Sequence, residues 1–142
     1  MIAVDTNVLV YASRTETEFH EPAARLITQL AESERPWAIP WPCVYEYLRI
    51  VTHPRLFKPA STQAEAISGL RLLSGSPSLA FIGPGSTHFG SLVGLAEHSG
   101  AKGNLFFDLQ IAAICREHGI TEILTVDRDF SRFSGIKVRR PF

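Results

Sequence analysis

The chain opens with Met1-Ile2-Ala3-Val4-Asp5-Thr6-Asn7-Val8-Leu9-Val10-Tyr11-Ala12, in which three polar residues separate two apolar runs. The first run predicts a short buried strand, and the second predicts a helix that follows at once. Asp5 therefore stands at the carboxyl end of a buried strand, where open α/β sheets bind their ligands. Because an unpaired buried charge is costly, this carboxylate needs a partner. It is either an N-cap of the following helix or a ligand-binding group.

Length and composition predict one folded domain that spans residues 1–142. A chain of 142 residues can bury a sizeable core. Its 14 acidic and 14 basic side chains balance, so a nucleic acid would have to bind a local basic patch. The two cysteines, Cys43 and Cys115, are far apart, and the start Met1-Ile2-Ala3-Val4-Asp5 does not have the pattern of a signal peptide. We expect free thiols in a cytoplasmic protein without a membrane-spanning segment.

Short apolar runs alternate with helical patterns along the rest of the chain. The predicted strands are 2–4, 37–39, 79–82, 123–126 and 136–138. The predicted helices are 8–12, 21–32, 42–51, 63–73, 87–97 and 105–118. Thr62 and Glu65 form a capping box for the fourth helix, and Asn104 is the expected cap of the last one. This alternation predicts a two-sided α/β fold with a parallel sheet of about five strands.

Acidic residues recur at places that such a sheet brings together. Asp127 follows the fourth predicted strand as Asp5 follows the first, so the two lie close if those strands are neighbours. Asp108 is in the first turn of its helix, Glu46 lies on the helix 42–51, and Asp129 comes two residues after Asp127. Ordinary structural roles stay open for the later acids: a helix N-terminus for Asp108, a turn for Asp127 and Asp129, and a solvated helix face for Glu46.

The convergence of these carboxylates would be unfavourable without a cation. Neighbouring carboxylates repel each other and raise one another's pKa, and a divalent ion removes that cost. An all-oxygen ligand set without His or Cys selects Mg²⁺ or Mn²⁺ over Zn²⁺. Such an ion can lower the pKa of a bound water and neutralise charge on a phosphate. The acids therefore indicate a metal-dependent site for phosphoryl transfer or phosphodiester hydrolysis.

Four motifs occur in order along the chain: Asp5-Thr6-Asn7-Val8-Leu9-Val10, Glu46 on the third predicted helix, Asn104-x-x-x-Asp108-x-x-Ile111-Ala112-Ala113, and Thr125-x-Asp127-x-Asp129-Phe130. Together they resemble the PIN-domain ribonucleases, and most of all the VapC toxins of bacterial VapBC toxin–antitoxin pairs. The likeness covers essentially the whole chain. It implies a PIN-like, three-layer α/β/α fold with an acidic pocket at the carboxyl edge of a central parallel sheet.

The resemblance implies an endoribonuclease that uses Mg²⁺ or Mn²⁺ and cuts tRNA, rRNA or mRNA. The residues that match the catalytic acids of the family are Asp5, Glu46, Asp108 and Asp127. Among them Asp5, Asp108 and Asp127 would be the nearer metal ligands, and Glu46 would act through water. The residues that match positions around the pocket are Thr6, Asn7, Asn104, Thr125 and Asp129. The implied reaction is in-line attack of water on a phosphate, which leaves a 5′-phosphate and a 3′-hydroxyl.

The expected partners are an RNA substrate, a VapB-type antitoxin and a second copy of the chain in a homodimer. Basic side chains that could line an RNA path are Arg14, Arg49, Arg55, Lys58, Lys102 and Arg132. Of these, Arg55 and Lys58 are the preferred RNA contacts because they follow soon after the Glu46 helix. The resemblance implies an apolar groove that an antitoxin segment covers. The candidate contacts there are Trp41, Tyr45 and one of Phe106 and Phe107.

Other classes of protein share part of this pattern. Phosphatases of the haloacid dehalogenase type and receiver-type phosphotransfer domains also carry Asp after a first strand. The former need a second Asp two residues later, where Asn7 stands. The latter need a strand-end Lys late in the chain, where Thr125-Val126-Asp127 stands. A PIN scaffold that only binds RNA or protein is a third alternative, against which the complete acidic set argues.

Overall fold

A computed structural model describes all residues, 1–142, and a five-stranded sheet forms its centre. The strands are β1 (Ile2–Val4), β2 (Trp37–Pro40), β3 (Leu79–Ile82), β4 (Glu122–Leu124) and β5 (Lys137–Arg139). Every pairing is parallel, and the strand order is β3-β2-β1-β4-β5. The predicted parallel sheet is confirmed. Because β1 and β4 are neighbours, the residues that follow them are brought side by side.

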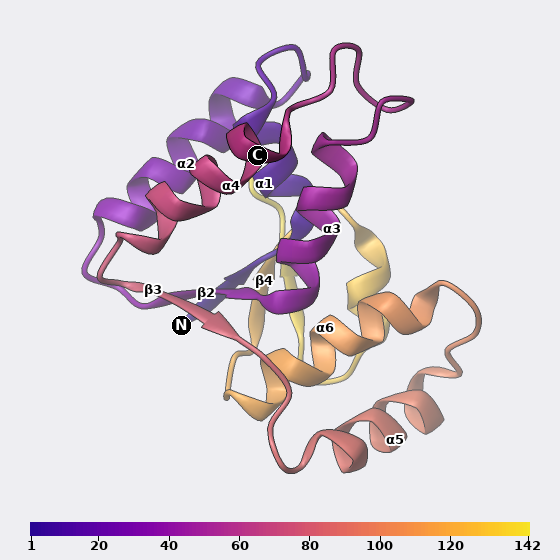
Figure 1. Cartoon of the computed structure of the whole chain (residues 1–142). Coiled ribbons are helices and arrows are strands. Elements are labelled where there is room, and N and C mark those ends of the chain that lie inside the picture. The colour runs from indigo at the N-terminus through magenta and orange to yellow at the C-terminus, as the bar shows by residue number, and fades with distance from the viewer.

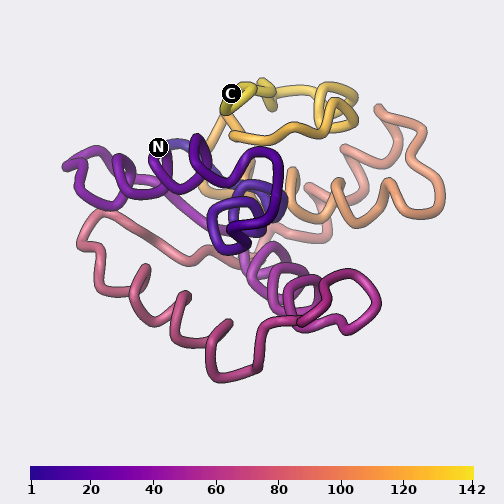
Figure 2. The backbone as a smooth tube through the Cα atoms, turned by 90° about the horizontal axis from the view of Figure 1, so that it is seen from above, coloured from indigo at the N-terminus to yellow at the C-terminus, as the bar shows by residue number.

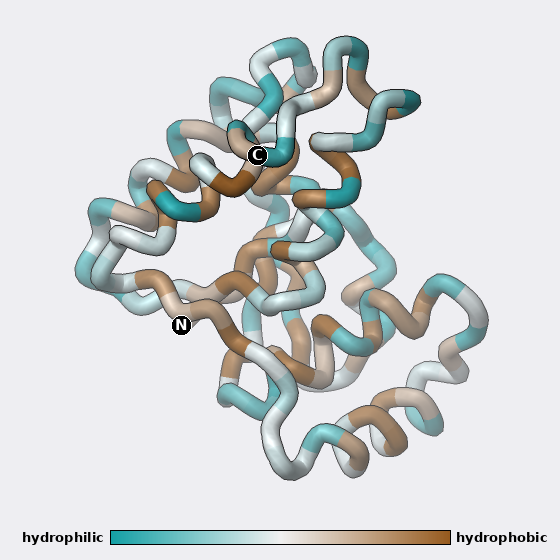
Figure 3. Tube along the Cα trace, in the orientation of Figure 1, coloured by the Kyte–Doolittle hydropathy of each residue, from teal (hydrophilic) through white to brown (hydrophobic).

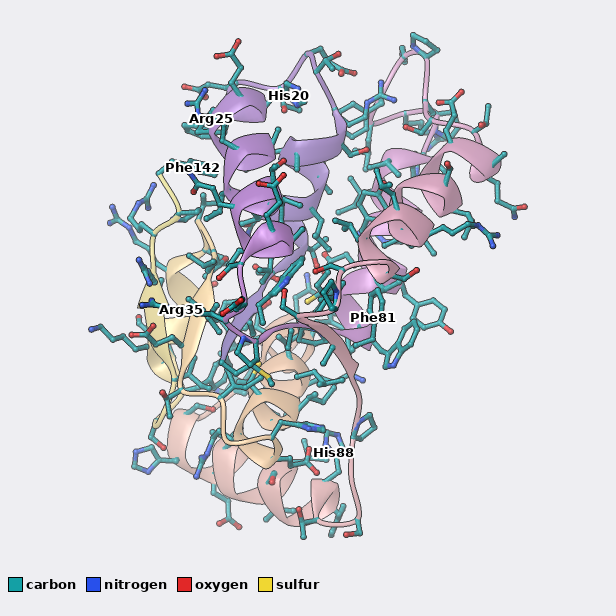
Figure 4. All side chains as sticks on the ribbon, turned by 90° about the vertical axis from the view of Figure 1, so that its left-hand side faces the viewer. His20, Arg25, Arg35, Phe81, His88 and Phe142 are labelled. Atoms are coloured by element: carbon teal, nitrogen blue, oxygen red, sulfur yellow. The ribbon has the colours of Figure 1, made fainter.

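Helices cover both faces of the sheet (Figure 1), and Figure 4 shows the same layers from the side with every side chain drawn. They are α1 (Thr6–Ser13), α2 (His20–Glu32), α3 (Trp41–Val51), α4 (Gln63–Ser74), α5 (His88–Ser99), α6 (Leu105–Glu117) and the 3₁₀ helix η1 (Arg128–Arg132). In Figure 1, α1 and α2 lie above the sheet and α5 and α6 below it. Seen from above, α5 and α6 lie on the opposite side of the molecule from α2 and α4 (Figure 2). This arrangement is the predicted three-layer α/β/α fold.

Strand β2 and the last long helix contribute much of the core. Every residue of β2 is buried, and Trp37 is fully enclosed. Helix α6 buries a continuous apolar run from Ile111 to Cys115, in which Ala112 and Ala113 have no exposed surface. Hydrophobic colour accordingly follows the strands and α6, whereas the outer loops are largely hydrophilic (Figure 3). The two cysteines are buried free thiols, as the sequence predicted.

The residue types at helix and strand ends predicted some of these ends correctly and others incorrectly. Thr62 caps α4 as predicted, because its hydroxyl accepts a 3.1 Å hydrogen bond from the Glu65 N–H. Asn104 precedes α6, but its side chain makes no capping bond. Its backbone is already helical (φ −63°, ψ −19°), whereas a capping side chain needs an extended residue. Strand β4 is shorter than predicted, so Thr125 lies just beyond its end.

No helix has the length and apolar character that crossing a bilayer requires.

Trp37 offers a test of the central packing. Its indole Nε1 is buried and donates to no acceptor. Trp37→Phe removes this unpaired donor together with one ring, and the two effects on stability oppose each other. In urea titrations we expect the free energy of unfolding to fall by less than about 1.5 kcal/mol, against about 3–5 kcal/mol for Trp37→Ala. Equal losses in the two variants would contradict this balance.

Candidate active site

Asp5 is held at the junction of β1 and α1 by four donors. Its Oδ1 accepts hydrogen bonds from the Thr6 N–H at 2.7 Å and from the Cys43 thiol at 3.7 Å. Its Oδ2 accepts from Asn7 Nδ2 at 2.9 Å and from the Thr125 hydroxyl at 2.7 Å. Burial raises the pKa of Asp5, and the bonds from Thr125 and Thr6 oppose that rise. Asp5 is thus the N-cap of α1 and also a nearly buried carboxylate, only 5% exposed, at the sheet edge.

Thr125 ties the ends of β1 and β4 together. Its fully buried hydroxyl donates to Asp5 while it accepts from Asn7 Nδ2 at 2.9 Å and from the Asp127 N–H at 3.0 Å. Asn7 Oδ1 in turn accepts from the Val126 N–H at 3.3 Å. The amide and hydroxyl that the motifs singled out therefore join the Asp5 carboxylate to the turn that carries Asp127.

Glu46 approaches the same place from α3. Its Oε2 accepts a 3.0 Å hydrogen bond from the hydroxyl of Thr6, the first residue of α1. Its Oε1 lies 4.0 Å from an Arg49 guanidinium nitrogen, and its side chain is 44% exposed. One carboxylate oxygen is thus fixed by α1, while the other faces a more open environment. The charge of Glu46 also contributes to raising the pKa of Asp5.

Three further carboxylates lie close to one another. One carboxylate oxygen of each residue lies within 4.8 Å of one oxygen of each of the other two; the residues are Asp108, Asp127 and Asp129. Asp108 comes from the first turn of α6, and Asp127 caps η1 by accepting a 2.8 Å bond from the Asp129 N–H. None of the three forms a salt bridge with a basic side chain. We call these residues the three-acid cluster.

The electrostatics show that all five acids share one neighbourhood. The pKa of Asp108 is raised to about 7, first by burial and then by the charges of four acids, Asp127, Asp5, Asp129 and Glu46. An unpaired, oxygen-only group with such mutual repulsion suits a hard divalent cation such as Mg²⁺ or Mn²⁺. The residues present therefore fit the ion that the sequence motifs implied.

The three predicted metal ligands, Asp5, Asp108 and Asp127, differ in how free their carboxylate oxygens are to bind an ion. Asp108 and Asp127 belong to the three-acid cluster, and Asp129, whose role the sequence left open, completes it. Each oxygen of Asp5 already accepts two hydrogen bonds, which fills the four or so lone-pair sites of a carboxylate. Direct ligation by Asp5 would require one donor to give way.

The other predicted contact residues lie outside this network. Asn104, Arg55 and Lys58 are exposed, and their side chains make no hydrogen bond or salt bridge. The aromatic candidates are also exposed: Trp41 by 43%, Tyr45 by 70%, Phe106 by 43% and Phe107 by 68%. Sequence reasoning missed the thiol of Cys43 as a donor to Asp5. Its position three residues before Glu46 on the same helix was the available signal.

Substitution of Thr125 tests the network around Asp5. Thr125→Val keeps the shape but leaves the Asp127 N–H without its acceptor and Asp5 without one donor. We expect the free energy of unfolding to fall by about 2–3 kcal/mol, and by about 1 kcal/mol for Thr125→Ser, which keeps the hydroxyl. Chemical denaturation measures both. A valine variant as stable as the serine variant would show that the hydroxyl contributes little.

The raised pKa of Asp108 predicts how stability depends on pH. This carboxyl titrates near 4 in an unfolded chain and at about 7 in the folded protein, so the folded state holds its proton longer. The stability of the folded state therefore falls as pH rises through that interval. In EDTA, we expect Asp108→Asn to be more stable than the parent at pH 8, by on the order of 1 kcal/mol after allowance for solvent screening. At pH 4 the two should match, and an equal gain at both pH values would contradict the charge effect.

Comparisons with known proteins place this geometry in a family. The family model described as PIN domain matches residues 2–136. Ribonuclease VapC48 of Mycobacterium tuberculosis is 31% identical over 138 residues, which cover 97% of this chain and 95% of that protein. Ribonuclease VapC43 of the same species is 32% identical over 141 residues, which cover 99% of this chain and 95% of the relative.

Solved structures show the same fold. VapBC2 from Rickettsia felis, bound to a DNA fragment from its promoter, superposes with a TM-score of 0.69 at 20% identity and covers 98% of each chain. Mycobacterium tuberculosis VapC20, described as a Sarcin-Ricin loop cleaving toxin, gives a TM-score of 0.67 at 16% identity and covers 96% of this chain and 98% of the other. Together with the family model and the near full-length relatives, this shows that the chain belongs to the PIN domain family, as a VapC-type member.

Proposed function

We propose that the protein is a metal-dependent endoribonuclease and the toxin of a type II toxin–antitoxin pair. The observation that carries the proposal is the convergence of the three-acid cluster, whose oxygens lie within 4.8 Å of one another, with Asp5 and Glu46 close enough to affect Asp108. The relatives that bear the name ribonuclease support the reaction class. Membership of the PIN family removes the phosphatase and receiver alternatives.

The proposed ligands of Mg²⁺ or Mn²⁺ are Asp108, Asp127 and Asp129. When bound, the ion supplies positive charge for the scissile phosphate and lowers the pKa of a water molecule. Asp5 acts beside it, because its carboxylate orders Thr125 and, through that hydroxyl, the backbone of Asp127. The negative charge of Asp5 also favours a cation at the cluster, as its effect on the pKa of Asp108 indicates.

Glu46 is the proposed acceptor of a proton from the attacking water. Thr6 holds one of its oxygens, so the carboxylate has a fixed orientation toward the first turn of α1. The other oxygen has no hydrogen-bond donor closer than the 4.0 Å contact with Arg49. A carboxylate that is partly exposed and partly held in this way can position a water and accept its proton.

A VapB-type antitoxin is the proposed protein partner. An apolar cavity of about 160 Å³ opens between α1, α2, α3 and α4, lined by residues that include Leu9, Ile27, Tyr47, Leu70 and Leu73. Open apolar surface of this kind supports a partner segment that covers it. The exposed side chains of Trp41, Tyr45, Phe106 and Phe107 remain candidates for the same partner or for a second copy of the chain.

Cleavage assays test the proposed reaction. Purified protein is incubated with tRNA and ribosomal RNA, with and without Mn²⁺, and the cut ends are mapped. We expect cleavage that requires Mn²⁺ and leaves 5′-phosphate and 3′-hydroxyl ends. Asp5→Asn and Asp108→Asn should each keep the fold and lower the rate by about 10³ or more, because charge stabilisation of the transition state is lost.

Glu34→Gln is the matched control, because Glu34 is an exposed acid in the turn between α2 and β2 that forms no salt bridge. Its cleavage rate should equal that of the parent. Parent-like cleavage by Asp5→Asn, or equal cleavage in EDTA, would contradict the proposed function. Circular dichroism of each variant confirms that a lost rate does not reflect lost structure.

A further inference from the structure

Arg14, the C-cap residue of α1, joins that helix to the loop 53–61 that follows α3. Its guanidinium donates to the Pro59 carbonyl at 2.7 Å and to the Ser61 hydroxyl at 2.8 Å. It also lies over the Phe57 ring, 4.5 Å from the ring centre, and Glu16 accepts from its Nε at 3.0 Å. Only 12% of the Arg14 side chain is exposed. The expectation that Arg14 itself lines an RNA path is therefore wrong, because its donors are used within the protein.

The loop that Arg14 holds presents two cations to solvent. Arg55 and Lys58 are exposed, and neither forms a salt bridge. The loop is also closed at its base, where the Ser61 N–H donates to the Val51 carbonyl at 2.8 Å. In Figure 1 this segment projects at the top of the molecule, beyond the end of α3. Within the loop, the Leu56 and Phe57 N–H groups also donate to the His53 carbonyl. The shape of the loop thus depends on these backbone bonds and on Arg14, which contacts Phe57, Pro59 and Ser61.

The same two helices connect this loop with the acidic residues. Helix α1 has Asp5 at one end and Arg14 at the other, while α3 carries Glu46 and leads directly into the loop. The eight residues of α1 span about 12 Å at 1.5 Å per residue. One strand of duplex DNA advances about 3.4 Å along its axis for each phosphate, so three to four phosphates cover about this length. A nucleic-acid strand that follows α1 from Asp5 therefore reaches Arg14, which the loop 53–61 contacts, within a few nucleotides.

We propose that Arg14 is a positioning residue for RNA: it fixes the loop 53–61 so that Arg55 and Lys58 contact phosphates a few nucleotides from the scissile bond. The inference rests on the proposed ribonuclease function. Arginine suits this role because its planar guanidinium donates to several acceptors in a fixed fork, which the single ammonium of lysine cannot do. Arg14 acts on RNA only through the geometry of the loop.

The test is the salt dependence of RNA binding. Fluorescein-labelled single-stranded RNA of mixed sequence is bound by Asp5→Asn protein, which leaves the probe uncut. Each lost phosphate contact flattens the plot of log Kd against log salt by about 0.7. The double substitution Arg55→Ala with Lys58→Ala should therefore flatten it by about 1.4. Arg14→Lys keeps the net charge of the chain, yet we expect it to flatten the plot by a similar amount and to weaken binding roughly fivefold.

Two further readouts separate positioning from a general loss of structure. Arg14→Lys should have no additional effect in the protein that already lacks Arg55 and Lys58, because it acts through them. The affinity of the Arg14→Lys variant for Mn²⁺ should equal that of the parent, because Arg14 forms no hydrogen bond or salt bridge with the three-acid cluster. In cleavage assays on the Asp5-containing protein, KM should rise about fivefold and kcat should change by less than about twofold.

Ser61→Ala and Arg71→Ala complete the set. Ser61→Ala removes one acceptor of Arg14 without any change of charge, so it should shift binding in the same direction by a smaller amount. Arg71 is an exposed arginine on α4 without a salt bridge, and its removal should leave RNA binding unchanged.

Parent-like binding by Arg14→Lys, full additivity with the loop substitutions, or a loss of Mn²⁺ affinity would each overturn the proposal. Failure of the proposed function has a different signature, which is RNA binding by the parent without Mn²⁺-dependent cleavage. A parent that binds no RNA would overturn both.

Discussion

Carboxylates repel one another at one edge of the sheet, and the structure around them has to hold them together despite this repulsion. The parallel order places β1 beside β4, so Asp5 and Asp127 emerge as neighbours, and α6 brings Asp108 to the same edge. No basic side chain neutralises the three-acid cluster. Burial raises the pKa of Asp108 most, and the charges of the neighbouring acids raise it further. A divalent cation relieves that repulsion. The fold thus concentrates mutually repelling carboxylates at the site where the cleavage reaction is proposed to occur.

Hydrogen bonds that span the whole chain hold this unfavourable arrangement in place. Thr125 and Asn7 lie 118 residues apart in sequence, and their side chains meet over Asp5 at the ends of two adjacent strands. Thr6 ties Glu46 of α3 to the same point. At the opposite end of α1, Arg14 organises a basic loop in a protein whose formal charge is zero. One helix therefore relates the acids that are proposed to cut RNA to the cations that are proposed to hold it.

The sequence predicts the architecture well because the fold depends on local periodicity. Alternating strands and helices, the capping box at Thr62 and the acid after each of β1 and β4 were all visible in the chain. Contacts between distant residues were harder to foresee. Asn104 has the residue type of a cap but a helical backbone, and Arg14 resembles a surface base although its acceptors come 45 and 47 residues later. Asp129 was a candidate from the sequence, but its place beside Asp108 and Asp127 depends on the turn after β4.

Calorimetric titration of the protein with Mn²⁺, in buffers that differ in ionisation enthalpy, tests the central claim most directly. We expect one binding process that releases about half a proton at pH 7, where Asp108 is half ionised, and almost none at pH 9. Asp108→Asn should abolish that pH-dependent release and weaken binding. Absence of Mn²⁺ binding, or binding with the same proton release at every pH, would contradict a shared cation as the solution to carboxylate repulsion.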